Sequence, residues 1–247
     1  MLGFLKQQPI VRRWSARKYF WKAYNGDGEW ELRELANYVP KDRLAIDVGG
    51  NIGVYAYHLQ RLAREVVVFE PNPTYVDRLR RAGVGKRLEP VALSDHVGTA
   101  ELRIPLWRGQ EYGGMGSLEE GAVPGSTLSR TVPVQLKRLD EYGFTNVGFI
   151  KIDVEGHEEA VLRGGVETLA QSRPTLLIEI EERHNPGGLD RIRAMLAGYD
   201  GYFFIHGHRK SLNDFDPTIH QRIEDLETAI TSRRGSPYIN NFLFVPN

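Results

Sequence analysis

Short apolar runs alternate with stretches of helical periodicity along most of the chain. The runs predict strands at residues 44–48, 65–70, 88–93, 147–152, 175–180, 201–206 and 241–245. Apolar positions at helical spacing, bounded by proline or glycine, predict helices at residues 52–64, 73–82, 156–169 and 188–198. Because strands and helices take turns, we expect an α/β fold in which helices cover both faces of a mostly parallel sheet.

Two further segments, residues 98–104 and 131–136, alternate apolar and polar positions and predict exposed strands that pair with each other. Between them, residues 107–129 are rich in Gly, Ser and Glu and lack periodicity, as functional loops often do. We therefore expect a helical extension at residues 1–40 and one domain at residues 41–247, with a loop and hairpin insertion at about residues 96–136.

Residues 1–24 combine basic and aromatic side chains and contain no acidic residue. Such a segment can form a surface for a membrane or an anionic substrate, or a helix that packs on the domain with its basic face in water. We favour the packed helix, because many ordinary surface helices have this composition. Exposed aromatic patches tend to be interfaces, and on that ground we expect a homodimer.

The overall composition narrows the class of protein. The 32 basic and 32 acidic residues balance, so charge gives no reason to expect a nucleic-acid partner. The chain has no cysteine, which excludes disulfides, zinc–thiolate sites and thiol nucleophiles. No apolar run reaches the ~18 residues of a transmembrane segment, and the N-terminus lacks the pattern of a signal peptide. We expect a cytoplasmic protein.

Acidic residues close or follow several of the expected strands. They are Asp47, Glu70, Asp95, Asp153 and Glu181. The carboxyl ends of parallel strands meet at one edge of a sheet, and ligands of such sheets bind outside that edge. The sequence therefore predicts a ligand site there.

The turn after the first strand contains Gly49, Gly50 and Gly53 and follows Asp47. This spacing differs from the Gly-x-Gly-x-x-Gly of dinucleotide-binding turns, and no Walker sequence is present. An acid beside the turn suits a cationic ligand with an amino group, such as S-adenosylmethionine, better than a pyrophosphate. An NAD-dependent oxidoreductase remains an alternative, and the basic N-terminal segment keeps an RNA or other nucleic-acid methyltransferase as a second one.

Five motifs occur in a fixed order: Asp-Val-Gly-Gly-Asn-Ile-Gly at 47–53, Phe-Glu-Pro-Asn-Pro at 69–73, Ala-Leu-Ser-Asp at 92–95, Ile-Lys-Ile-Asp-Val-Glu-Gly-His-Glu at 150–158 and Pro-Thr-Leu-Leu-Ile-Glu-Ile at 174–180. Together they resemble the FkbM family of class I S-adenosylmethionine-dependent methyltransferases. The resemblance implies a Rossmann-like fold with a seven-stranded, mostly parallel sheet and an antiparallel last strand. It also implies O-methylation of a sugar, a glycoside or a natural-product hydroxyl.

The resemblance further implies roles for individual cofactor-binding residues. The methionine side of the pocket would be shaped by Asp47, Gly49, Asn51 and Gly53. Glu70 would bind the ribose hydroxyls, with Pro71 and Asn72 beside the adenosine, and Ser94 and Asp95 near the adenine. Asp153 would lie next to the reacting methyl group.

A neutral hydroxyl acceptor benefits from a general base. The candidates are Asp153, Glu155, His157, Glu181 and His184. Three of these also fit roles without chemistry: Glu155 can be a first-turn acid of the expected helix, His157 lies near the N-terminus of that helix, and His184 follows a strand in an expected surface loop. Some class I O-methyltransferases use a divalent cation near this position, but the usual Asp-Asp or Asp-Asn pair is missing, so we expect no metal.

Overall fold

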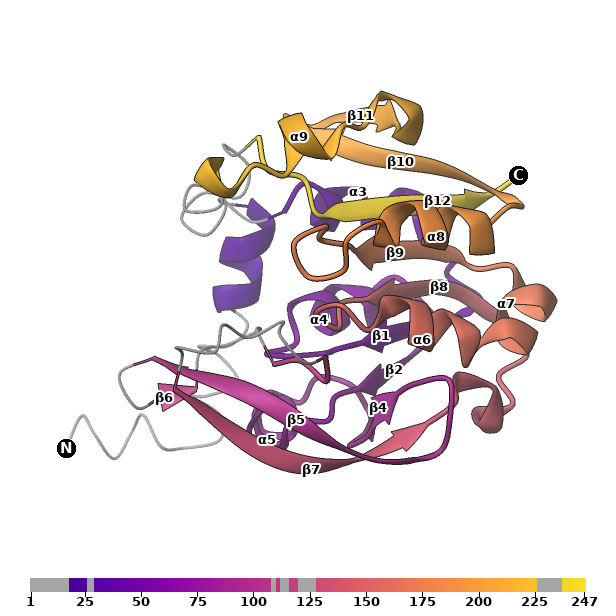
Figure 1. Ribbon diagram of the computed structural model, residues 1–247. Helices are drawn as coiled ribbons and strands as arrows, with labels where there is room; N and C mark the ends of the chain where they lie inside the picture. The colour runs from indigo at the N-terminus through magenta and orange to yellow at the C-terminus, as the bar shows by residue number, and fades with distance from the viewer. Residues whose placement is uncertain (1–17, 26–28, 108–109, 112–115, 120–127, 226–236) are drawn as a thin grey trace.

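The computed structural model describes residues 18–25, 29–107, 110–111, 116–119, 128–225 and 237–247. Its centre is an eight-stranded sheet in the order β11-β10-β12-β9-β8-β1-β2-β3 (Figure 1). Five neighbouring strands run parallel: β3 (Arg87–Glu89), β2 (Glu65–Phe69), β1 (Leu44–Val48), β8 (Val147–Ile152) and β9 (Thr175–Glu179). The antiparallel pairs involve β12 (Asn241–Pro246), β10 (Tyr199–Ile205) and β11 (His208–Ser211).

The last strand, β12, is antiparallel to both its neighbours, which confirms the expected sheet, but there is one strand more than predicted. The additional strand is β11, which pairs with β10 through a two-residue turn at His206 and Gly207. Both turn residues have positive φ, 50° and 79°, as a type I′ hairpin requires. Sequence analysis missed this hairpin because its first turn position holds His rather than the usual Asn or Asp.

Helices cover both faces of the sheet (Figure 1). On one face lie α3 (Glu31–Tyr38), α4 (Val54–Leu59) and α5 (Pro73–Ala82), and on the other α6 (Glu158–Arg163), α7 (Val166–Ser172) and α8 (Gly188–Met195). Shorter elements are η1 (Leu139–Tyr142), η2 (Leu212–Asp214), α9 (Pro217–His220) and η3 (Ile223–Asp225). Strands β1 and β8 are buried along their whole length, which explains their continuous apolar runs.

The strand predicted at residues 88–93 is divided at Pro90 into β3 and β4 (Ala92–Leu93). Proline has no N–H to continue a ladder, so the chain leaves the central sheet there. Strand β4 then joins a second sheet, in the order β4-β7-β5-β6, with β5 (Gly98–Trp107), β6 (Gln110–Glu111) and β7 (Ser129–Lys137). The long β5–β7 pairing confirms the predicted pairing of the two exposed segments.

The helix predicted at residues 156–169 is also divided, into α6 and α7, at Gly164 and Gly165. A Cβ atom at Gly164 would overlap the backbone carbonyl oxygen of Ser94. The glycine therefore lets the end of α6 lie directly against the residue that follows β4. This contact joins two distant segments, and residues beside it in the chain, Leu93 and His157, line the pocket described below.

The N-terminal segment packs on the domain where the structure describes it. Residues 18–25 are helical, and the Phe20 side chain is only 2% exposed. Its ring lies 4.8 Å from that of Tyr57, and its carbonyl oxygen lies 3.2 Å from Nε2 of His58. The packed-helix interpretation is confirmed for these residues, whereas residues 1–17 lie outside the described part. Within the described ranges, no helix is long and apolar enough to cross a membrane.

The Phe20 contact generates a stability prediction. We expect Phe20→Ala to lower the free energy of unfolding by about 3 kcal/mol, because it opens a cavity between the N-terminal helix and α4. The adjacent Tyr19 is 53% exposed, so Tyr19→Ala is the matched control and should change stability by less than about 1 kcal/mol. Urea unfolding of the three proteins makes the comparison, and equal effects of the two substitutions would contradict the packing.

Candidate functional site

The glycine turn after β1 joins the ends of three strands. The backbone N–H groups of Gly49 and Gly50 both donate to the carbonyl oxygen of Phe69, at 2.9 and 3.1 Å. Gly49 has φ of +81°, and a Cβ atom there would overlap the backbone carbonyl of Asp153. The turn needs glycine at this position, because its backbone touches the end of β2 on one side and the end of β8 on the other.

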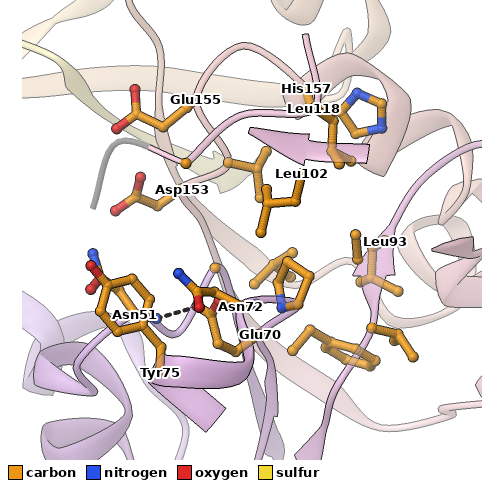
Figure 2. A pocket seen from close by; sticks show the side chains of 18 residues that line it. Asn51, Glu70, Asn72, Tyr75, Leu93, Leu102, Leu118, Asp153, Glu155 and His157 are labelled. Carbon is orange, nitrogen blue, oxygen red and sulfur yellow. Dashed lines mark hydrogen bonds between the residues drawn. The ribbon is translucent and has the colours of Figure 1, made fainter. Parts of the chain in front are cut away.

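A pocket opens beside this turn at the carboxyl edge of the parallel strands (Figure 2). The carboxylates of Asp153 and Glu155 lie on one side of it, and apolar side chains lie on the other. The apolar part is formed by Val91, Ala92, Leu93, Leu102 and Leu118. Sequence analysis missed Leu102 and Leu118, which come from the insertion and whose place depends on how the second sheet folds back over the edge.

Glu70 lies in the pocket between the polar and apolar sides and is 5% exposed. Its Oε2 accepts from the backbone N–H of Asn51 at 2.6 Å, and its Oε1 accepts from that of Asn72 at 2.8 Å. Burial raises the pKa of Glu70 to about 7, against the opposing effect of these two donors. Glu70, predicted to bind the ribose, lines one pocket together with Pro71 and Asn72, which were predicted to lie beside the adenosine.

Asp47 and Gly53 lie behind the pocket rather than in its lining. Asp47 is 1% exposed, and its Oδ2 has no hydrogen-bond partner among the described residues. Burial raises the pKa of Asp47 to about 7, although the nearby Lys151 opposes the rise. Gly53, with φ of 92°, precedes α4, and a Cβ there would press on Leu79.

The side chains of Ser94 and Asp95, predicted near the adenine, are engaged elsewhere. Asp95 pairs with His96 at 2.8 Å and with Arg163 at 3.0 Å, and these bonds lower its pKa to about 2. Ser94 is fully buried, and its Oγ lies 3.0 Å from Nε2 of His157. Residues 91–93 thus contribute apolar side chains to the pocket. The polar residues that follow them bind Arg163 of α6 and His157, which precedes α6.

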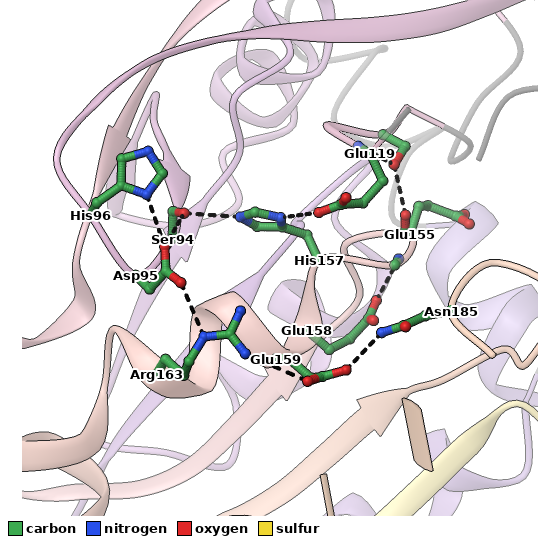
Figure 3. A network of polar contacts seen from close by, with 12 residues as sticks. Ser94, Asp95, His96, Glu119, Glu155, His157, Glu158, Glu159, Arg163 and Asn185 are labelled. Carbon is green, nitrogen blue, oxygen red and sulfur yellow. Dashed lines mark hydrogen bonds and ion pairs between the residues drawn. The ribbon is translucent and has the colours of Figure 1, made fainter. Parts of the chain in front are cut away.

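His157 connects the insertion to the central sheet (Figure 3). Its Nδ1 lies 2.6 Å from Oε1 of Glu119, and its Nε2 faces Ser94. Ser117 strengthens the connection, because its Oγ donates to the carbonyl oxygen of Glu155 at 2.7 Å. With both ring nitrogens bound to protein groups, His157 tethers residues 116–119 in this arrangement, and its role as a base stays a prediction.

Three carboxyl groups gather at the polar side of the pocket. One oxygen each of Asp153, Glu155 and Glu179 lies within 4.8 Å of the others. The β8–β9 register, which pairs Ile152 with Ile178, explains why Asp153 and Glu179 are neighbours. Burial, and then repulsion from Asp153, raises the pKa of Glu179 well above its usual value. Carboxylate oxygens this close together also suit a divalent cation. That the site uses no metal therefore stays a prediction.

The other two candidate bases lie around this group without lining the pocket. The side chain of His184 is 6% exposed, and its Nδ1 lies 3.1 Å from Oε2 of Glu155. Glu181 accepts from Arg183, from the hydroxyl of Tyr238 at 3.1 Å and from Nδ2 of Asn240 at 3.3 Å. His184 thus pairs with Glu155 and Glu181 pairs with Arg183, and the predicted role of either residue as a base is not tested by these contacts.

Lys151, which sequence analysis did not assign to the site, lies beneath the carboxyl groups. It is fully buried within β8, and its Nζ donates to Oδ1 of Asn241 at 3.1 Å. Oδ2 of Asp153 lies 3.9 Å from Nζ of Lys151. The sequence did contain one signal for Lys151, which is a basic residue inside an otherwise apolar buried strand. Burying such a charge is costly unless it has partners, so its presence points to a polar site nearby.

Comparisons with known proteins identify the family of this chain. A family model described as the methyltransferase FkbM domain matches residues 47–211. The 2-O-methyltransferase NoeI of Sinorhizobium fredii is 29% identical over 57% of this chain and 65% of its own length. The hexuronic acid methyltransferase AglP of Haloferax volcanii is 31% identical over 70% of each chain. A third relative, methyltransferase 1 of Beauveria bassiana, is 26% identical, and the match spans 59% of it.

Solved structures show more distant overall similarity. The methyltransferase FkbM from Methylobacillus flagellatus KT aligns with a TM-score of 0.48 and 14% identity, covering 82% of this chain and 43% of that one. SMU.1697c from Streptococcus mutans, solved in complex with SAH, aligns with a TM-score of 0.47 and 9% identity, covering 88% and 96%. The family assignment therefore rests on the match of residues 47–211 to the family model and not on these structures.

The buried Asp47 carboxyl predicts how stability depends on pH. Its pKa rises from 3.8 to about 7 on folding, so between those values the folded state holds a proton that the unfolded state has released. The free energy of unfolding should therefore fall as pH rises from 4 to 7. Glu70 and Glu158, whose pKa values burial also raises to about 7, add to the same trend.

In Asp47→Asn, the decrease between pH 5 and pH 8 should be smaller by roughly 2 kcal/mol, because one ionising group is gone. Urea unfolding at the two pH values measures this, with Asp77→Asn on the exposed face of α5 as the control. A decrease in Asp47→Asn as large as in the wild type would show that this carboxyl does not titrate as expected.

Proposed function

Because the chain belongs to the FkbM methyltransferase domain family, we propose that it transfers the methyl group of S-adenosylmethionine to a hydroxyl group of a saccharide. The observation that carries the cofactor assignment is the pocket at the carboxyl edge of β1, β2 and β8, with one apolar and one acidic side. S-adenosylmethionine has matching parts, since it joins a flat adenine and a ribose to a sulfonium and an ammonium group.

The residues of the pocket fit this cofactor in three places. Leu93, Leu102 and Leu118 offer an apolar slot for the adenine, and Glu70 offers carboxylate oxygens to the ribose hydroxyls. Asp153 and Glu155 offer negative charge to the cationic end. When bound, the cofactor supplies a methyl group that is already activated by the sulfonium. The protein must then orient the acceptor, exclude water and accept a proton.

We assign the general base to Asp153. It is the acid at the end of β8, it lines the pocket, and burial raises its pKa, so that its carboxylate is a better proton acceptor than an exposed one. Glu155, backed by His184, lies beside it and can orient the acceptor hydroxyl. Residues 116–119, tethered through His157, cover the apolar side and limit the access of water.

Two observations bear on the acceptor. NoeI and AglP are named for 2-O-methylation and for methylation of a hexuronic acid, and this supports a saccharide. The carboxyl groups of Asp153, Glu155 and Glu179 supply several hydrogen-bond acceptors close together, which suits a molecule with neighbouring hydroxyl groups.

The acidic side of the pocket disfavours the two alternative functions, an NAD-dependent oxidoreductase and a nucleic-acid methyltransferase. NAD carries a pyrophosphate, which would have to lie beside the buried acids of this pocket. A nucleic-acid acceptor would bring phosphates to the same acidic edge, on a chain with no net positive charge to attract them.

Glu70 gives a test of cofactor binding. We expect Glu70→Gln to weaken the binding of S-adenosylhomocysteine by 10-fold or more, because charge-assisted hydrogen bonds to hydroxyl groups each contribute about 1.5–3 kcal/mol. Isothermal titration measures the dissociation constant, and Glu101→Gln, at an exposed position of β5, should leave it unchanged. Equal affinity of Glu70→Gln and the wild type would remove Glu70 from the cofactor site.

Asp153 gives a test of the chemical step. We expect Asp153→Asn to lower kcat by about 10²-fold or more, as loss of a general base does, with a much smaller effect on S-adenosylhomocysteine affinity. Transfer of labelled methyl groups to methyl glycosides of hexoses and hexuronic acids measures kcat, and Asp77→Asn serves as control. Turnover at the wild-type rate in Asp153→Asn would assign the proton transfer to another group.

A further inference from the structure

Lys151 occupies an unusual place for a lysine. It is the last residue but one of β8, a strand with neighbours on both sides, and it is fully buried. Its Nζ donates to Oδ1 of Asn241 at 3.1 Å and to the carbonyl oxygen of Ile152 at 3.3 Å, and it lies 5.1 Å from the centre of the Tyr55 ring. A buried ammonium is stable only with such partners, and here each partner comes from a separate part of the chain.

The strand registers direct this ammonium toward the acidic side of the pocket. Asp47 pairs with Lys151 across β1 and β8, so both side chains project from the same face of the sheet. Asp153 follows two residues later and projects from that face as well. Asn241 pairs with Glu179 across β12 and β9, which places the amide that binds Lys151 beside the third acid.

Acidic groups surround Asp153 from every side that packs against it. They are Asp47 on β1, the Tyr55 phenol on α4, Glu70 after β2, Glu155 after β8, Glu158 on α6, and Glu179 and Glu181 at and after β9, with His184 behind Glu155. Among the residues described, Lys151 is the cation in direct ion-pair distance of Asp153. Without it, burial and repulsion would favour the protonated and inactive form of Asp153.

We propose that Lys151 is a positioning residue that keeps Asp153 ionised at neutral pH and thereby sets the lower pH limit of methyl transfer. Asn241 fixes the ammonium from β12, so the last strand of the sheet takes part in the site without touching the pocket. The inference rests on the proposed function, because it assumes that Asp153 is the general base.

The test is the pH dependence of kcat in Lys151→Met, which removes the charge and keeps most of the volume. The acidic limb of the profile should move upward by one pH unit or more, since an opposite charge at this distance lowers a carboxyl pKa by about 1–3 units. The rate should recover toward the wild-type value at high pH, where Asp153 ionises again. A purely structural loss would lower the rate at every pH and leave the limb in place.

Two further variants complete the experiment. Lys151→Gln is neutral but can still donate to Asn241, so it should show the same shift even if Lys151→Met folds poorly. Lys86→Met, at an exposed position, should leave the profile unchanged. An unmoved acidic limb in an active Lys151→Gln enzyme would overturn the inference about Lys151 and leave the proposed function in place. A wild-type protein without methyl transfer, or a fully active Asp153→Asn variant, would overturn the proposed assignment of the base and the inference with it.

Discussion

Repulsion among buried carboxyl groups at one edge of the sheet is the constraint on which the rest of the site depends. Asp153, Glu155 and Glu179 approach within 4.8 Å of one another, and Asp47 is buried close behind them. Within the described part of the chain, Lys151 is the lysine at ion-pair distance of Asp153 and is placed to neutralise this charge. The imbalance costs stability in the absence of a ligand and favours a cationic one, which supports the proposal that these groups bind the cationic end of the cofactor.

The backbone brings these groups together through contacts that allow little variation. Gly49 must lie against the carbonyl of Asp153, and Gly164 against that of Ser94, so the ends of β1, β8 and α6 are held at fixed separations. The insertion then closes the apolar side, where Glu119 and His157 tie it to the turn after β8. The pocket is therefore formed by residues of two sheets, although its charged side belongs to the central one.

The sequence predicted those parts of the structure that depend on local patterns. Strands β1 and β8 begin and end at the predicted residues, because buried parallel strands are continuous apolar runs. The divisions at Pro90 and at Gly164 were missed, since periodicity continues through them. Glu70 was predicted from its place after β2, whereas Lys151 and Glu119 act through partners about 90 and 40 residues away in the chain, which no local pattern reveals.

The central claim is that the pocket between the leucines and the acids binds S-adenosylmethionine. Titration calorimetry of the wild-type protein with S-adenosylhomocysteine, and separately with NAD, tests it most directly. The account predicts micromolar binding of S-adenosylhomocysteine and no measurable binding of NAD. Binding of NAD alone, or of neither ligand, would contradict the assignment of the glycine turn and leave the family's fold without its cofactor.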